Sequence, residues 1–411
     1  MPFIADFHIH SKYSRATAKD MDLASLARWA KIKGIAMLGT GDFTHPVWFS
    51  ELKSKLRPSG APGVYQYDGV LFILTAEVSN IYFKAGRTRK VHNMIFAPSI
   101  EAAEEAISAV SEYGALPSDG RPILSVDCAR MARLLTGVDP AIFLVPAHAW
   151  TPHFSVFGSN SGFDSPEECY EDQTDKIFSI ETGLSSDPAM NWRWPKLDRF
   201  CLTSNSDAHS PSKIGREANV FRDKIDYNEL IDILKKKDKE RFLYTIEFFP
   251  EEGKYHWDGH RDCKTRLAPQ EAMKTNNICP VCGKKVTIGV MHRLEALAKR
   301  PEGYVDKTSP GFKRVVPLVE IIANAMGVGP DSVKVEREYM QLIKNFGTEF
   351  NILLYMDEKE LKENLPERIA KGVLNVREGN IEVVPGYDGE YGKVKVFKEG
   401  DSAKDKQMSF F

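Results

Sequence analysis

Long apolar runs, a strong net charge and a disulfide framework are all missing from this sequence of 411 residues. No run approaches the roughly 20 apolar residues that a membrane helix needs, so we expect no membrane span. The formal net charge of −2 gives no overall bias toward nucleic acid or a membrane surface. Met1-Pro2-Phe3 leads straight into an expected strand, without the basic and apolar regions of a signal peptide. Together these absences predict a cytoplasmic protein.

Cysteine is scarce, and its six residues fall into two kinds. Cys128, Cys169 and Cys201 are scattered, whereas Cys263, Cys279 and Cys282 lie close together. In a reducing compartment, a close group of cysteines indicates metal ligation rather than disulfide bonding.

The clustered cysteines have the spacing of a structural zinc site. His260-Arg-Asp-Cys263 and Cys279-Pro-Val-Cys282 each place two residues between the two ligands. His260 is the expected fourth ligand beside Cys263, Cys279 and Cys282, and His256 is the alternative. Three unrelated thiols are the less favoured interpretation. We therefore predict a small zinc-binding module, held folded by its metal.

The same region is basic. From Lys254 to Arg314 there are 13 Lys and Arg residues against 6 Asp and Glu residues. This excess favours contact with a phosphate backbone about as much as it favours a solvated basic surface. Arg261, Lys284 and Lys285 are the candidate DNA contacts.

Short apolar strands alternate with helical segments from Met1 to about Phe221, which predicts an α/β fold with a parallel sheet or a β/α barrel. The expected helices are Leu23–Lys33, Ile100–Tyr113 and Tyr227–Lys237, the last closing the barrel. The expected strands are Phe3–His8, Ala36–Asp42, Leu71–Val78, Lys90–Ala97, Ile123–Val126, Phe143–His148, Phe178–Glu181 and Phe200–Ser206.

Histidines and carboxylates stand at the ends of these strands. His8 and His10 end the first strand, and alternate residues of a strand point to one face, so both can bind one ion. In β/α barrels, chemistry gathers where the C-terminal strand ends meet. Any single residue could be a helix cap, but the set predicts a site for two or three divalent ions, Zn²⁺, Mg²⁺ or Mn²⁺. The candidate ligands are His8, His10, Asp42, Glu77, His92, His148, Asp207 and His209.

Asp42, Glu77, His148 and Asp207 are the candidate catalytic residues within this set. A carboxylate that bridges two ions, Glu77 or Asp207, would support hydroxide formation near neutral pH and the displacement of a phosphoryl group.

An aromatic-rich segment runs from Trp150 to Trp194, directly after an expected catalytic strand. Trp150, Phe154, Trp192 and Trp194 are candidates for a base pocket or DNA contact, because aromatic rings stack on bases. The alternative is a hydrophobic lid packed on the barrel.

The C-terminal third is expected to be mainly helical, with helices at Val315–Met326, Val335–Phe346 and Lys359–Ala370. Gly327-Val-Gly329 follows no strand, so we interpret it as a helix C-cap and a turn. Asn375–Phe397 is expected to form a β-hairpin that turns at Asp388-Gly389. The predicted organisation is therefore a barrel at 1–240, the zinc module at 241–310, a helical DNA-binding domain at 311–400 and a disordered tail at 401–411.

The strand-end residues resemble the motif set of the polymerase-and-histidinol-phosphatase (PHP) family: His8-Ile-His10, Gly41-Asp42, Glu77, His92, His148 and Asp207-Ala-His209. That resemblance implies a distorted (β/α)7 barrel with a multinuclear metal site that hydrolyses phosphoesters. The family's second motif usually reads Thr-Asp-His, whereas this chain has Gly41-Asp42-Phe43-Thr44-His45. His45 either replaces the missing histidine or lies off the site.

Barrel, zinc knuckle and helical C-terminus together resemble the endonuclease Q family over essentially the whole chain. The resemblance implies a DNA repair endonuclease that cuts 5′ to deaminated bases (uracil, hypoxanthine, xanthine) and abasic sites, by base extrusion and attack of metal-bound hydroxide. Its implied partners are such damaged double-stranded DNA and the sliding clamp (PCNA), since Gln407 and Phe410 match the first half of a clamp-binding box. The main alternative is a PHP-type phosphatase of small phosphate monoesters, and a weaker one is a non-catalytic DNA-binding protein.

Overall fold

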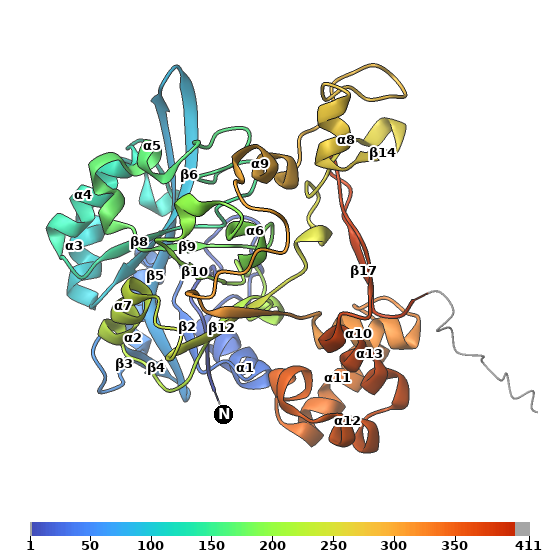
Figure 1. The fold of residues 1–411 in the computed structure, drawn as a ribbon. Coiled ribbons are helices and arrows are strands. Elements are labelled where there is room, and N and C mark those ends of the chain that lie inside the picture. The colour runs from blue at the N-terminus through green and yellow to red at the C-terminus, as the bar shows by residue number, and fades with distance from the viewer. Residues whose placement is uncertain (1, 399–411) are drawn as a thin grey trace, which may run out of the picture.

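The computed structural model describes residues 2–398. Figure 1 shows a large α/β region at the left, a small region around α8 (Pro269–Lys274) at the upper right, and a helical region at the lower right. The expected tail at 401–411, with Gln407 and Phe410, lies outside the described residues. Among residues 2–398, no helix is both long and apolar enough to cross a membrane.

Strands and helices follow each other along the chain as expected for a mixed α/β protein. The helices are α1 Leu23–Lys33, α2 Pro46–Lys55, α3 Ile100–Ser111, α4 Cys128–Val138, α5 Pro166–Tyr170, α6 Pro188–Asn191, α7 Tyr227–Lys236, α8 Pro269–Lys274, α9 Val290–Leu297, α10 Leu318–Met326, α11 Val333–Phe346, α12 Glu358–Asn364 and α13 Glu367–Glu378. The strands are β1 Phe3–Asp6, β2 Met37–Gly39, β3 Arg57–Pro58, β4 Tyr65–Tyr67, β5 Val70–Lys84, β6 Arg87–Ala97, β7 Ile123–Leu124, β8 Phe143–Pro146, β9 Ser179–Glu181, β10 Cys201–Thr203, β11 Ala218–Phe221, β12 Phe242–Glu247, β13 Asp258–His260, β14 Thr265–Leu267, β15 Gly311–Arg314, β16 Glu382–Val384 and β17 Lys393–Lys395.

The main sheet is mixed rather than parallel. β1, β2 and β5 are parallel neighbours, as expected, but β6 runs antiparallel to both β5 and β8. The reason is a tight turn at Ala85 and Gly86, whose φ angles of 52° and 77° suit a two-residue hairpin. β9 and β10 form a separate parallel pair. The seven-stranded barrel therefore stays a prediction, while the mixed α/β class is observed.

Two apolar layers support the strands. Inside, Phe7, Phe96 and Phe143 pack with the buried face of α7, in a cluster that includes the first residues of β1, β2, β8 and β10, so this helix lies at the N-terminal ends of these strands. Outside, α1, α3 and α4 bury their apolar faces in the largest core. The polar residues at the opposite strand ends are left to form the site described below.

The segment predicted to bind zinc, called the zinc module below, is inserted between neighbouring strands of the main sheet. β12 pairs antiparallel with β11, and β15, on the far side of the module, pairs in parallel with β12. The boundaries predicted at residues 240 and 310 therefore place β12 in the zinc module and β15 in the C-terminal domain. Both strands in fact extend the main sheet of the α/β region.

The C-terminal helices differ in detail from the expectation. The expected helix Lys359–Ala370 is two helices, α12 and α13, because Pro366 stands between them and cannot continue a helix. α13 runs into the expected hairpin and ends at Gly379, so the hairpin strands are only β16 and β17. The turn at Asp388-Gly389 is confirmed, with φ of 43° and 89°. Gly327 caps α10 in the left-handed conformation, as predicted.

A buried ion pair attaches these helices to the α/β region. Lys33 of α1 lies 2.9 Å from Glu349 Oε2, and both side chains are buried. Glu349 also accepts hydrogen bonds from the Tyr339 hydroxyl (2.6 Å) and the Leu318 amide (3.0 Å). Burial acts to raise the pKa of Glu349, but Lys33 and these donors hold it below its ordinary value of 4.5.

Glu349→Gln should lower the free energy of unfolding by about 3–5 kcal/mol at neutral pH, because it leaves the Lys33 ammonium buried without a counter-charge. A carboxylate with a depressed folded pKa stabilises above its unfolded pKa, and this contribution is lost as the pH falls through the folded pKa. The difference from the wild type should therefore shrink as the pH falls below about 4.5. Urea unfolding over this pH range measures it.

Glu358→Gln is the matched control, because Glu358 pairs with Lys362 on the exposed face of α12. Glu358→Gln should lower the free energy of unfolding by less than about 1 kcal/mol. Equal costs for the two variants would contradict a structural role for the buried pair.

Candidate metal centre

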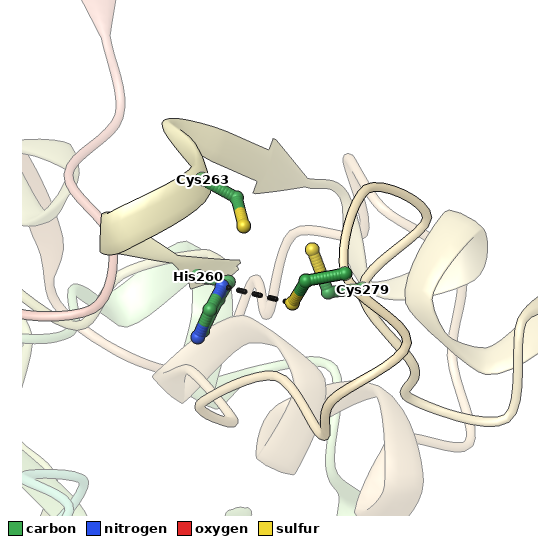
Figure 2. Close-up of side chains that lie close together, drawn as sticks. His260, Cys263 and Cys279 are labelled. Atoms are coloured by element: carbon green, nitrogen blue, oxygen red, sulfur yellow. Dashed lines mark hydrogen bonds between the residues drawn. The ribbon is translucent and has the colours of Figure 1, made fainter.

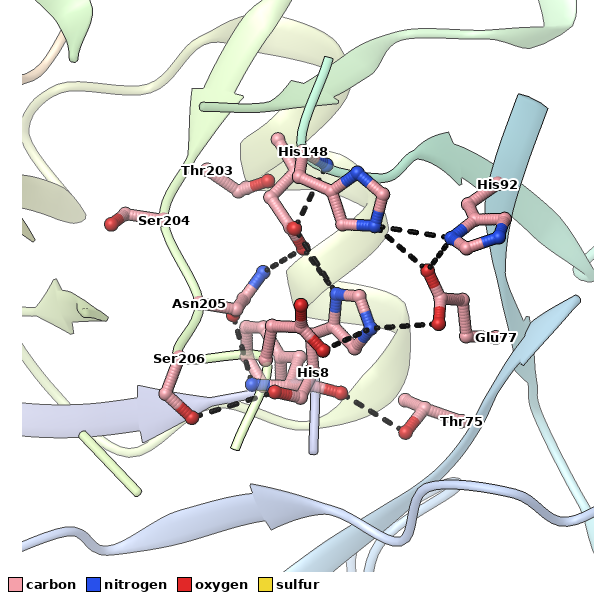
Figure 3. Close-up of polar contacts among 12 residues, drawn as sticks. His8, Thr75, Glu77, His92, His148, Thr203, Ser204, Asn205 and Ser206 are labelled. Carbon is pink, nitrogen blue, oxygen red and sulfur yellow. Dashed lines mark hydrogen bonds and ion pairs between the residues drawn. The ribbon is translucent and has the colours of Figure 1, made fainter. Parts of the chain in front are cut away.

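Side chains from distant strands meet in two overlapping groups at one end of the main sheet. His8, His10, Glu77 and Asp207 offer ligand atoms that all lie within 4.8 Å of one another. Glu77, His92 and His148 form a second such group. Figure 3 shows Glu77 between His8 on one side and His92 and His148 on the other. Glu77 is thus the residue shared by both groups, the position that a bridging carboxylate would take.

The two oxygens of Glu77 face different partners. Oε1 lies 2.7 Å from His92 Nδ1 and 2.9 Å from His148 Nε2. Oε2 lies 3.3 Å from His10 Nε2 and 3.7 Å from His8 Nε2. Asp207 Oδ1 completes the first group, at 3.0 Å from His10 Nε2 and 3.7 Å from His8 Nε2.

One buried atom in this cluster lacks a partner. His8 Nε2 is fully buried and has no hydrogen bond. The opposite ring nitrogen, Nδ1, lies 3.0 and 3.1 Å from the Glu181 carboxylate oxygens, which fixes the ring with Nε2 turned toward Glu77 and Asp207. A carboxylate behind a histidine is the usual support of a metal ligand. The residues present therefore fit a divalent cation.

The electrostatics of the cluster favour positive charge. Burial lowers the pKa of His8, yet the carboxylates of Glu181 and Glu77 raise it well above its ordinary 6.5. Burial also acts to raise the pKa of Asp207, yet the hydrogen bond from His10 and the charge on His8 lower it. His92 behaves differently, because burial lowers its pKa to about 4 and leaves it neutral, the form that binds a metal.

Three of the sequence-predicted residues have left-handed backbones. Asp42, His148 and Asp207 have φ angles of 47°, 31° and 47°. Such conformations cost about 1–3 kcal/mol each in non-glycine residues and gather at functional sites.

Asp42 lies behind His10 rather than among the ligand groups. Its Oδ1 accepts from His10 Nδ1 at 3.0 Å. Its Oδ2 accepts from the Ser11 amide and hydroxyl and from the Ser14 hydroxyl, at 2.6 to 2.9 Å. One oxygen therefore orients His10, as Glu181 orients His8, and the other is held by Ser11 and Ser14.

His209 and His45 lie beside the cluster. The His209 ring is 4.5 Å from that of His10, and its Nδ1 is 3.6 Å from Asp207 Oδ1, outside both ligand groups. His45 caps α2 and stacks on Tyr13, so of its two interpretations the structure favours the one off the site.

Sequence reasoning missed Glu181 and Arg121. Glu181 ends an expected strand, and that position was the available signal. Arg121 precedes the short strand β7 and carries no such signal, yet its Nη1 lies 3.0 Å from Glu77 Oε2. It adds a partly exposed cation at the edge of the cluster.

The aromatic segment is mostly a packed layer. Trp150, Trp192 and Trp194 are buried, and Trp150 and Trp194 pack on each other and on Phe157. This agrees with the hydrophobic-lid alternative for these three residues. Phe154 is different, since its half-buried ring lies 4.8 Å from the His92 ring and remains a candidate DNA contact.

The zinc module gathers its four predicted ligands. His260, Cys263, Cys279 and Cys282 form a group within 4.8 Å, and Figure 2 shows the labelled members pointing toward a common centre. Burial opposes ionisation of Cys279, but backbone amides of Cys282 and Val281 lower the pKa of its thiol to about 6. Thiolate is the form that binds zinc. The apolar core beside them holds only Ala272, Cys279 and Val286, together with partly buried neighbours.

The other candidates of the module lie away from this group. His256, the alternative fourth ligand, is buried elsewhere and takes no part in it. Arg261, Lys284 and Lys285 are exposed, as DNA contacts would need to be.

Comparisons with known sequences agree with this architecture. The family described as the MJ0043 C-terminal domain matches residues 317–380. The uncharacterized protein MJ0043 of Methanocaldococcus jannaschii is 33% identical over 256 residues, which are 60% of this chain and 31% of that protein. This chain therefore matches only about a third of the length of that relative. The uncharacterized protein YqxK of Bacillus subtilis is 28% identical over 410 residues, 95% of this chain and 98% of that protein.

Two solved structures are similar over nearly the whole chain. The lesion-specific endonuclease PfuEndoQ of Pyrococcus furiosus is 31% identical with a TM-score of 0.87, covering 99% of this chain and 98% of that one. A complex of endonuclease Q with a 27-mer duplex, which has an abasic lesion at the active site, is 32% identical with a TM-score of 0.86. It covers 99% of this chain and 100% of that one. The likeness thus extends over all three regions.

Proposed function

Because this chain belongs to the endonuclease Q family and is therefore a nuclease, we propose that it repairs DNA by cutting the phosphodiester bond 5′ to damaged nucleotides. The proposed lesions are deaminated bases (uracil, hypoxanthine and xanthine) and abasic sites. The observation that carries the proposal is the pair of ligand groups joined at Glu77. An abasic duplex bound to the related endonuclease Q supports the same class of substrate.

The residues of the cluster have separate tasks in this proposal. His8, His10 and Asp207 would hold one cation, His92 and His148 would hold another, and Glu77 would be shared by the two groups. When bound, divalent cations would lower the pKa of water and offset the charge of the phosphate. Arg121 adds a fixed positive charge beside Glu77 for the same phosphate. Glu181 and Asp42 hold the rings of His8 and His10 in orientation.

DNA binding is assigned to the zinc module and the C-terminal helices. The exposed Arg261, Lys284 and Lys285 would contact phosphates, which gives affinity without sequence preference. The damaged nucleotide would then be extruded, which costs least where pairing is already weak. A cytoplasmic location and a clamp partner remain predictions, and pull-down of the clamp with full-length but not tail-deleted protein tests the latter.

A labelled duplex with a single uracil, incubated with and without Mg²⁺, Mn²⁺ or Zn²⁺, tests the proposed function. We expect a metal-dependent nick immediately 5′ to the uracil, a nick at an abasic site, and none in the undamaged duplex. Release of phosphate from a small monoester without nicking would favour the phosphatase alternative. Binding of the duplex without either reaction would contradict both enzyme assignments.

A further inference from the structure

The loop that follows β10 serves the first ligand group with three successive residues. Asp207 supplies one of the ligand atoms of that group. Ser206 Oγ donates to the His8 carbonyl at 3.5 Å (Figure 3). Asn205 Nδ2 donates to Glu181 Oε2 at 3.0 Å, and Glu181 is the carboxylate behind His8. The position of this loop therefore affects one ligand directly and the support of another.

The backbone of the loop is held by the side chain of Arg216. Its Nε donates to the Ser206 carbonyl at 2.8 Å, and its Nη2 donates to the Asp207 carbonyl at 3.3 Å. The Asp6 carboxylate accepts from the Ser206 amide at 3.0 Å and from the Gly215 amide at 2.8 Å. Ser206 is thus tied, through its amide and its carbonyl, to the segment that carries Arg216.

Asp207 needs such support because of its backbone conformation. Its φ angle of 47° lies in the left-handed region, which residues other than glycine seldom adopt. A conformation of this kind persists only where the surrounding contacts impose it. The Asp207 carbonyl also accepts from His209 Nδ1 at 2.9 Å. The hydrogen bonds to the carbonyls of this loop therefore help to keep Asp207 Oδ1 beside His10 and His8.

Arg216 also borders a cavity of about 320 Å³. The walls of this cavity include Trp29 of α1, Tyr339 of α11 and the exposed Lys213. Within residues 2–398, both hydrogen bonds of the Arg216 side chain go to the loop, and no carboxylate forms an ion pair with it. Shortening this side chain would therefore enlarge a partly polar cavity, not an apolar core, so we expect the fold to be retained.

We propose that Arg216 is a positioning residue, which fixes Asp207 as a ligand of the cation in the first ligand group. The inference deepens the proposed function and rests on it. Arginine suits this task, because its planar guanidinium presents several donors in a fixed geometry. The loop contributes no ligand to the second group, which consists of Glu77, His92 and His148. The effect of Arg216 should therefore be confined to the first cation.

Arg216→Ala should weaken the binding of one Mn²⁺ ion by about tenfold or more, because residues that support metal ligands contribute about 10–100-fold to metal affinity. The affinity for the other ion should stay at the wild-type value. Titration with Mn²⁺, followed by electron paramagnetic resonance of the free ion, measures both affinities. Anomalous diffraction at an intermediate Mn²⁺ concentration shows which ligand group has lost its ion.

Arg222→Ala is the matched control, because Arg222 is an exposed arginine that pairs with Glu240. It should bind both Mn²⁺ ions as the wild type does. Wild-type affinity at both groups in Arg216→Ala would overturn the inference. Equal weakening at both groups would also overturn it, since that result indicates a general structural role.

Arg216→Lys separates the charge of Arg216 from its geometry, and it keeps the inference testable if Arg216→Ala does not fold. Lysine keeps the positive charge but replaces the rigid fork of donors by a point charge on a flexible stem. We therefore expect the first ligand group of Arg216→Lys to bind Mn²⁺ more weakly than that of the wild type. Wild-type affinity in this variant would show that charge alone suffices and would overturn the positioning role.

The Mn²⁺ dependence of nicking separates a positioning role from a catalytic one. Arg216→Ala keeps every ligand side chain, so it should nick a uracil-containing duplex slowly at limiting Mn²⁺ and approach the wild-type rate at saturating Mn²⁺. A loss that persists at saturation would contradict the positioning role. Failure of the wild type to nick would instead contradict the proposed function, and the Mn²⁺ affinities would still decide the inference.

Discussion

Asp207→Asn should abolish nicking of a uracil-containing duplex and leave DNA affinity close to that of the wild type. Asp207 Oδ1 lies 3.0 Å from His10 Nε2 and 3.7 Å from His8 Nε2, and the substitution removes one negative charge from that ligand group. Loss of a residue that merely supports a metal ligand lowers metal affinity or activity by about 10–100-fold. Loss of a ligand itself should therefore lower the nicking rate by more than about 100-fold. Single-turnover nicking and fluorescence anisotropy with the same duplex measure the two quantities.

Asp223→Asn is the matched control, because Asp223 is an exposed carboxylate outside both ligand groups. It should nick at the wild-type rate. Circular dichroism of Asp207→Asn checks that the fold is retained, since the substitution leaves His10 without one of its carboxylate partners. A parallel loss of affinity and nicking in Asp207→Asn would contradict the role assigned to Asp207.

Cys279→Ser should remove the zinc of the module and much of the affinity for DNA. Cys279 is buried beside Ala272 and Val286 in a small apolar cluster, so we expect a bound metal to supply much of the folding energy of the module. Structural zinc contributes about 10–16 kcal/mol in comparable small units. Metal analysis should show one zinc ion fewer per chain, and anisotropy should show weaker binding with a shallower dependence on salt, because fewer phosphates are contacted.

Val281→Ser tests whether the loss of zinc and of DNA affinity comes from removing the Cys279 ligand rather than from disturbing the turn that carries it. Val281 lies between Cys279 and Cys282 and is 69% exposed. This variant should keep both its zinc and its affinity. Wild-type affinity in a Cys279→Ser protein that has lost its zinc would contradict a role of the module in DNA binding.

The sequence allowed several residues of the cluster to be found because they follow expected strands, although Glu77 and His92 lie within β5 and β6 rather than at their ends. His8 and His10 follow β1, and Asp207 follows β10, so the alternation of strands and loops indicated a common edge. It could not indicate which carboxylates point into the cluster and which support it from behind. Asp42 and Glu181 are carboxylates like Glu77, and only the folded chain shows that they orient histidines.

Other features depend on contacts between segments far apart in the sequence. Whether Trp150 and Trp194 face a ligand or each other is not encoded in their spacing. The insertion of the zinc module between β12 and β15 follows from a parallel pairing across more than sixty residues, which local patterns do not reveal. The break at Pro366, in contrast, was readable from the sequence, because proline cannot continue a helix.

Anomalous diffraction from crystals of the protein soaked in Mn²⁺ tests the central claim most directly, because it places the ions without reference to activity. The account predicts strong peaks in two places, one among His8, His10, Glu77 and Asp207, and the other among Glu77, His92 and His148. Ions bound elsewhere, with neither of these groups occupied, would contradict it.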